Sequence, residues 1–151
     1  MIHIVIEPSL PESVPEGVLE RAAAEALLGA GSADADLTIA LTDDAHIQAL
    51  NRDFLGHDFP TDVLSFPAGE TDPDTGALYL GDVVISVSRA AAQAREAGHS
   101  LEAEAQLLVV HGVLHLLGHD HGEAQDRDRM WSAQAEILQR LGLGGISVRE
   151  E

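Results

Sequence analysis

Cysteine and lysine are both absent from the 151-residue chain. The absence of cysteine removes several classes of chemistry. Without cysteine there is no disulfide, no thiolate nucleophile and no cysteine-ligated zinc, and the composition suits a reducing cytosol. A transition metal would therefore be held by imidazole, carboxylate or water. Long apolar runs are missing too, so we expect neither a signal peptide nor a membrane-spanning helix.

Positive charge is scarce, because 8 arginines stand against 26 acidic residues and leave a formal net charge of −18. A field of this sign repels nucleic acid at long range. An RNA substrate would then have to be held by a local patch or a metal. The acidity fits solubility alone equally well, so it does not name a substrate.

Hydrophobic periodicity predicts four strands and five helices in a single domain over residues 1–151. The expected strands are 2–6, 36–41, 62–66 and 78–86, and the expected helices are about 14–28, 43–55, 88–97, 100–117 and 123–141. The acidic stretch 68–76 is expected to be a hairpin connection or a flap. The fourth helix is apolar nearly all round, which predicts that it is buried.

Four of the 8 histidines fall in one short stretch, and three of them form the pattern His-x-x-x-His-x-x-x-x-x-His. His111 and His115 are one helical turn apart, so both imidazoles can point at one ion about 2 Å away. His119 would lie about 12 Å along a straight helix from His111, too far to share that ion. Gly118 can end the helix, and the turn would carry His121 toward the pair.

Three protein ligands leave one zinc position open, which is the pattern of catalytic rather than structural zinc sites. A metal-bound water there would have its pKa lowered toward neutrality and become a nucleophile. The spacing equals that of the metzincin peptidases, His-Glu-x-x-His-x-x-Gly-x-x-His, but Gly112 stands where they carry the glutamate base. Peptide hydrolysis by that route is therefore disfavoured. Three imidazoles also suit nickel, copper or iron.

Asp82 lies inside an apolar strand, where a carboxylate needs a partner. Two explanations stay open. The carboxylate either accepts backbone N–H bonds for structural reasons, or it accepts a hydrogen bond from a metal-bound imidazole.

The segment His111-Gly-Val-Leu-His-Leu-Leu-Gly-His-Asp-His121 resembles the signature of the YbeY endoribonuclease family, the bacterial rRNA maturation factors. Three further blocks are similar to that family: Asn51-Arg52 with Pro60-Thr-Asp-Val-Leu-Ser-Phe-Pro67, Leu80-Gly-Asp-Val-Val-Ile-Ser86, and Gly98-His-Ser100. The resemblance covers residues 40–140, approximately. One departure is Leu55, since family members often carry an arginine there. Arg52 is the nearest basic residue, but a helix places it on another face.

The resemblance implies an α+β fold: a single domain with a mixed sheet of about four strands, about five helices and a metalloprotease-like zinc helix. It also implies one zinc ion per chain, held by His111, His115 and His121, and metal-dependent cleavage of single-stranded RNA. In the family this activity serves maturation of the small-subunit rRNA 3′ end and ribosome quality control in the cytoplasm. The expected partners are rRNA and the ribosome or ribosomal proteins.

Asp62 and Ser65 are our candidate catalytic residues, which would orient groups around the metal. The nucleophile would be either metal-bound water or the 2′-hydroxyl of the substrate, and the sequence favours neither. Two other functions stay open. A metallopeptidase-like or other metallohydrolase would need a carboxylate base from elsewhere, and a non-catalytic zinc-containing ribosome-assembly factor would suit the acidity and Leu55.

Overall fold

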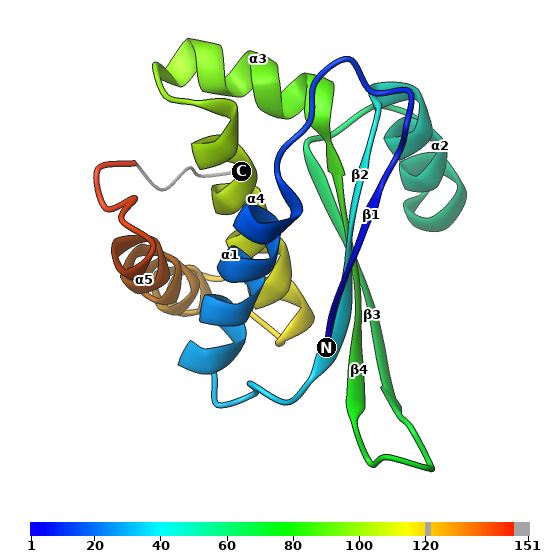
Figure 1. Ribbon diagram of the computed structural model, residues 1–151, viewed down its shortest axis with the longest axis vertical. Coiled ribbons are helices and arrows are strands. Elements are labelled where there is room, and N and C mark those ends of the chain that lie inside the picture. The colour runs from blue at the N-terminus through cyan, green and yellow to red at the C-terminus, as the bar shows by residue number, and fades with distance from the viewer. Residues whose placement is uncertain (120–121, 147–151) are drawn as a thin grey trace.

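One four-stranded sheet is packed against five helices in the computed structural model, which describes residues 1–119 and 122–146 (Figure 1). The elements are β1 (Ile2–Ile6), α1 (Glu16–Gly29), β2 (Asp36–Thr42), α2 (Asp44–Leu55), β3 (Val63–Thr71), β4 (Leu78–Ser86), α3 (Val87–Ala97), α4 (Leu101–Leu116) and α5 (Ala124–Arg140). The sheet is mixed, so the expected α+β fold is confirmed.

The strands follow the order β1-β2-β4-β3. The neighbours β1, β2 and β4 run parallel, and β3 runs antiparallel to β4 at the edge of the sheet. The acidic stretch 68–76 was expected to be a hairpin connection or a flap. It forms the hairpin between the antiparallel strands β3 and β4. However, β3 runs to Thr71, well beyond its expected end, because its ladder with β4 continues past an irregularity to the pair Thr71 and Leu78.

The two faces of the sheet support two hydrophobic clusters of very different size. Alternate residues of β2 and β4, such as Ile39 and Val83, join the main core with α1 and α4. The other face carries a small cluster in which Leu64 and Val84 pack on Ile47 of α2. Figure 1 shows α2 on one side of the sheet and α1, α4 and α5 on the other. Helix α4, which carries His111 and His115 and which we call the histidine helix, therefore belongs to the main core.

Helix α4 is buried along most of its length, as its uniform apolarity predicts. Ser100 begins it as the N-cap, and its side chain accepts a hydrogen bond from the Ala103 N–H at 3.1 Å. A cap of this kind contributes about 1 kcal/mol to helix stability. In the described part of the chain, no helix has the length and apolarity that crossing a bilayer requires.

Candidate metal centre

His111 and His115 lie on the same face of α4 with their imidazoles together. Their Nε2 atoms are 3.2 Å apart, and the ring planes meet at 75°. Two nitrogens bound at about 2.0–2.1 Å to one tetrahedral zinc ion would lie about 3.3 Å from each other. Because imidazole nitrogen is also a preferred zinc donor, the pair fits a shared zinc ion in both spacing and chemistry.

Gln134 holds the other nitrogen of His111. Its Oε1 lies 2.9 Å from the His111 Nδ1, and the Gln134 side chain comes from α5 with only 1% of its surface exposed. An amide oxygen can only accept a hydrogen bond, so this contact puts the imidazole proton on Nδ1. The Nε2 lone pair is then directed toward the point shared with His115, as metal-binding histidines require.

The sequence analysis missed Gln134, although a signal for it exists. The buried side of α5 consists of Met130, Gln134, Ile137 and Leu138. A glutamine in a helical stripe that is otherwise apolar needs a buried partner. That partner could not be named without the packing of α5 against α4.

Gly112 lies directly against Val83 and Ser65 of the sheet. A Cβ at this position would be 2.5 Å from Cγ1 of Val83 and 3.3 Å from Oγ of Ser65. Such distances leave no room for a side chain without movement of the helix. The glutamate of the metzincin pattern would not fit here, so the missing general base has a steric reason.

Ser65, one of the two candidate catalytic residues, lies on β3 beside the histidine helix. Its Oγ donates a hydrogen bond of 2.9 Å to the Gly112 carbonyl oxygen. That carbonyl belongs to the residue next to His111, so Ser65 fixes the helix to the sheet at the histidine pair. Its observed contact is with the backbone that carries the metal ligands.

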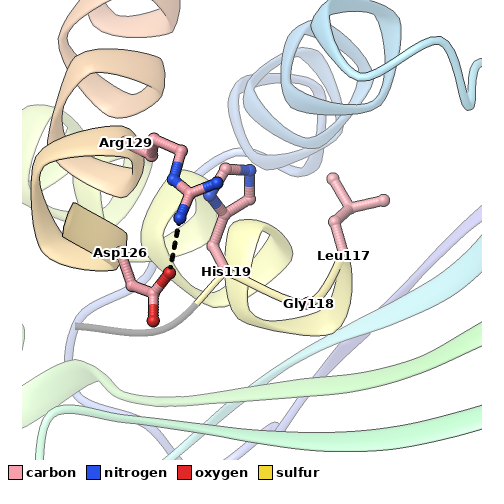
Figure 2. A pocket seen from close by; sticks show the side chains of 5 residues that line it. All are labelled: Leu117, Gly118, His119, Asp126 and Arg129. Carbon is pink, nitrogen blue, oxygen red and sulfur yellow. Dashed lines mark hydrogen bonds and ion pairs between the residues drawn. The ribbon is translucent and has the colours of Figure 1, made fainter. Parts of the chain in front are cut away.

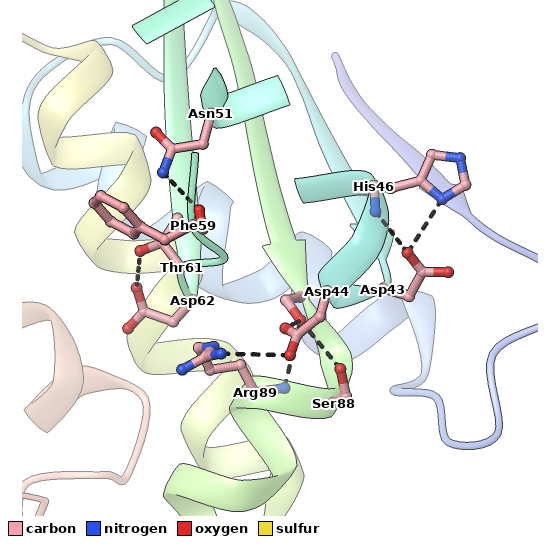
Figure 3. A network of polar contacts seen from close by, with 10 residues as sticks. Asp43, Asp44, His46, Asn51, Phe59, Thr61, Asp62, Ser88 and Arg89 are labelled. Carbon is pink, nitrogen blue, oxygen red and sulfur yellow. Dashed lines mark hydrogen bonds and ion pairs between the residues drawn. The ribbon is translucent and has the colours of Figure 1, made fainter. Parts of the chain in front are cut away.

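Asp62, the second candidate, is buried just before β3 begins. Its Oδ1 accepts a hydrogen bond of 2.8 Å from the Val63 N–H. It also accepts one of 3.4 Å from the Thr61 hydroxyl (Figure 3). Asp62 also lines a cavity of about 280 Å³ together with Arg89 and Gln93. Its present contacts are those of a cap at the start of the strand, with the cavity beside it.

The turn after α4 follows the expected path up to His119. The helix ends at Leu116, and Gly118 adopts a φ of 96°, a value that favours glycine. His119 lines a cavity of about 260 Å³ with Asp126 and Arg129, and the latter two form an ion pair of 2.9 Å (Figure 2). His121, the expected third ligand, lies outside the described residues. Within 1–119 and 122–146 no three metal-binding side chains form a group.

Within residues 1–119 and 122–146, Asp82 makes neither of the two contacts expected for it. Its carboxylate accepts a hydrogen bond from the Tyr79 hydroxyl, which in turn lies 2.7 Å from Oγ1 of Thr38. Burial and the hydrogen bond to Asp82 raise the pKa of Tyr79. The partner of the His111 imidazole is therefore Gln134 and not Asp82. Asp82 instead forms a chain of hydrogen bonds with Tyr79 and Thr38 on the sheet.

The comparisons with known proteins point to one family. Residues 9–142 match the family model described as Endoribonuclease YbeY. The chain is 50% identical over 131 residues to the Endoribonuclease YbeY of Pelotomaculum thermopropionicum, which covers 84% of this chain and 86% of the relative. The Endoribonuclease YbeY of Desulfitobacterium hafniense is 44% identical, covering 91% and 94%. The solution structure of TM1509 from Thermotoga maritima superposes with a TM-score of 0.58 at 25% identity, over 100% of this chain and 99% of that one.

Proposed function

The chain belongs to the YbeY endoribonuclease family, and from this premise we propose that it is a zinc-dependent endoribonuclease that cleaves single-stranded RNA. We propose that it acts as one domain, residues 1–151, in the cytoplasm. Its role there would be maturation of the small-subunit rRNA 3′ end and ribosome quality control. The proposed partners are rRNA and the ribosome or ribosomal proteins.

The observation that carries the zinc proposal is the histidine pair, whose Nε2 atoms lie 3.2 Å apart. We propose that His111, His115 and His121 hold one zinc ion per chain. When bound, zinc supplies Lewis acidity, which stabilises charge on phosphate oxygens and lowers the pKa of water. Gln134 supports this by fixing the tautomer of His111.

Asp62 and Ser65 have different proposed parts in the reaction. Ser65 fixes the carbonyl of Gly112, so it holds the histidine helix at a constant distance from β3. Asp62 lines a polar cavity with Arg89, where a carboxylate can orient a hydroxyl group of the substrate. We propose both as residues that orient groups around the reacting phosphodiester.

A peptidase function is poorly supported by the same helix. The closeness of Val83 to Gly112 leaves no space for a glutamate base at the position that the metzincins use. A ribosome-assembly factor without catalysis has one observation in its favour. Leu55, 49% exposed, occupies the position of the arginine, while Arg52 is engaged with Asp53 at 3.0 Å.

The proposal is tested by metal analysis and RNA cleavage with the same purified protein. We expect one zinc ion per chain and cleavage of a single-stranded RNA that stops when a chelator is added. His115→Ala should remove both zinc and cleavage, whereas His46→Ala, at an exposed histidine on α2, should keep both. Cleavage that survives the chelator and His115→Ala would come from a contaminating nuclease and would refute the enzyme. Zinc binding without any cleavage would favour the assembly factor.

The products of the same reaction distinguish the two nucleophiles. Attack by the 2′-hydroxyl leaves a 2′,3′-cyclic phosphate, whereas attack by water leaves none. An RNA with a 2′-deoxy sugar at the cleaved position resists the first route and remains a substrate for the second. Mass spectrometry of the two product sets therefore separates them.

A further inference from the structure

Three of the seven exposed large apolar residues in the described part of the chain lie at the end of α2 and on its connection to β3. The chain has 3 phenylalanines, and all of them lie between positions 54 and 66. Phe54 is 69% exposed, Phe59 54% and Leu55 49%. We name these three residues the aromatic surface. Single exposed apolar residues are ordinary, but a group of them marks a binding surface.

The two rings of the aromatic surface are held in place. The ring of Phe54 packs edge-on against Phe66 of β3, with centroids 5.6 Å apart, and that of Phe59 lies 5.5 Å from His57. The buried Asn51 side chain donates a hydrogen bond of 2.9 Å to the Phe59 carbonyl (Figure 3). Rings fixed in this way lose little entropy when a flat ligand stacks on them.

The negative net charge of the protein limits how this surface can bind an RNA. With a net charge of −18 and no lysine, neutralisation of phosphates gives little binding energy. Arg52, which lies on α2 two residues before Phe54, is already paired with Asp53. Outside the proposed metal site, an RNA bound by this protein is therefore held mainly through its bases. Bases present their faces to aromatic rings only when they are unpaired.

We propose that the aromatic surface stacks unpaired bases of the RNA substrate, so that base stacking replaces the phosphate contacts that this acidic chain lacks. The inference rests on the proposed endoribonuclease function. The position of β3 supports it. Phe66 of β3 touches Phe54 on the α2 face, and its neighbour Ser65 touches the histidine helix on the other face. Because β3 is an edge strand, an RNA strand that passes over this edge reaches both faces.

The first test measures binding of a fluorescein-labelled single-stranded 12-nucleotide RNA by fluorescence anisotropy, with a chelator present to prevent cleavage. Phe54→Ala and Phe59→Ala should each weaken binding about tenfold, because stacking of one base has roughly that value. Phe59→Trp should keep the affinity, and Phe59→Leu should lose it. Leu28→Ala, at a residue of α1 that is 61% exposed, is the matched control and should bind as wild type. Thermal melting checks the fold of each variant.

The second test replaces bases instead of side chains. A 12-nucleotide RNA with abasic sites keeps every phosphate, so we expect wild type to bind it as weakly as Phe59→Ala binds the normal RNA. A duplex of the same sequence should bind equally weakly. The slope of affinity against salt should be shallow and should not change in the phenylalanine variants.

Four outcomes have distinct meanings. Wild-type affinity in both alanine variants would overturn the inference. Full RNA affinity in Phe59→Leu would overturn the stacking as well, because it would show that an apolar contact without an aromatic ring is sufficient. If those variants also cleave RNA with the wild-type kcat/KM, the proposed function stands without the stacking surface. A wild-type protein that neither binds nor cleaves RNA refutes the proposed function and the inference together.

Discussion

The two ends of α4 hold their histidines with different partners. Near its beginning, Nε2 of His99 lies 2.7 Å from Oε1 of Glu104, whose side chain is fully buried. Near its end, Nδ1 of His111 lies 2.9 Å from Oε1 of Gln134. A carboxylate forms an ion pair with a protonated imidazole, whereas an amide oxygen orients an imidazole without adding charge. The contact between His99 and Glu104 therefore suits attachment of the start of α4, which we call the fastening end. The contact between His111 and Gln134 suits a metal-binding imidazole, and we call this the ligand end.

Glu104→Ala tests the fastening end and should have the largest effect on stability. Removal of this buried side chain takes away the hydrogen-bond partner of His99 and leaves a cavity, so the free energy of unfolding should fall by about 3 kcal/mol. Urea denaturation of the metal-free protein measures this, with Glu104→Gln as the milder variant. Zinc affinity should stay within about twofold of wild type, since the histidine pair is two turns further along the helix. A large loss of zinc affinity would show that the two ends are not separate.

Gln134→Met tests the ligand end and should weaken zinc binding about 10- to 100-fold, because the partner that orients His111 is removed. Gln134→Glu keeps an acceptor oxygen and should retain zinc. Competition with a fluorescent chelator measures both, and Gln139→Met on the exposed side of α5 is the control. Equal zinc affinity in Gln134→Met and wild type would remove the distinction between the two ends.

Gly112→Ala tests the packing beside the ligand end. A methyl group here meets Val83 at 2.5 Å, so we expect a loss of about 1–3 kcal/mol in unfolding free energy. Gly17→Ala in α1 is the matched control, because no atom lies within 4 Å of its added Cβ. That variant should be neutral or more stable by up to about 1 kcal/mol. Equal changes in unfolding free energy in both variants would mean that contact with Val83 does not decide the effect of Gly112→Ala.

Tyr79→Phe should have the smallest effect on stability. Tyr79 lies on β4 and belongs to neither end of α4. Burial, followed by the hydrogen bond to Asp82, raises the pKa of Tyr79 above its ordinary value of 10.0. The resulting stabilisation is complete below the unfolded-state pKa and is lost as pH rises through the folded-state pKa. Urea midpoints from about pH 8 to pH 11 should therefore fall more steeply for wild type than for Tyr79→Phe. Parallel curves would contradict the shift.

Local patterns in the sequence were enough to predict the elements and the histidine pair. The one-turn spacing of His111 and His115 and the glycine that ends their helix depend only on helix geometry. The extension of β3 was not predictable in the same way. Its last residues, Pro67–Thr71, are all exposed, and they form a strand only because β4 offers them a partner.

Contacts between distant segments explain the remaining differences. Gln134 acts on His111 across two helices, and the partner of Asp82 is Tyr79 on the same strand. The absence of a glutamate at Gly112 was visible in the sequence, but its steric reason needs the position of Val83. Pairwise contacts of this kind depend on packing, which periodicity does not encode.

The proposed metal site depends on two helices, and this would connect metal supply to protein abundance. His111 and Gln134 meet only when α4 and α5 are docked, so an unfolded chain does not have this arrangement. An ion that binds the folded form alone stabilises it by mass action, by about 2.7 kcal/mol at a free concentration 100 times its Kd. A gain of that size lowers the unfolded fraction about 100-fold, and the unfolded fraction is what proteases degrade. Cells short of the metal would therefore hold less of this protein, as well as less of its activity.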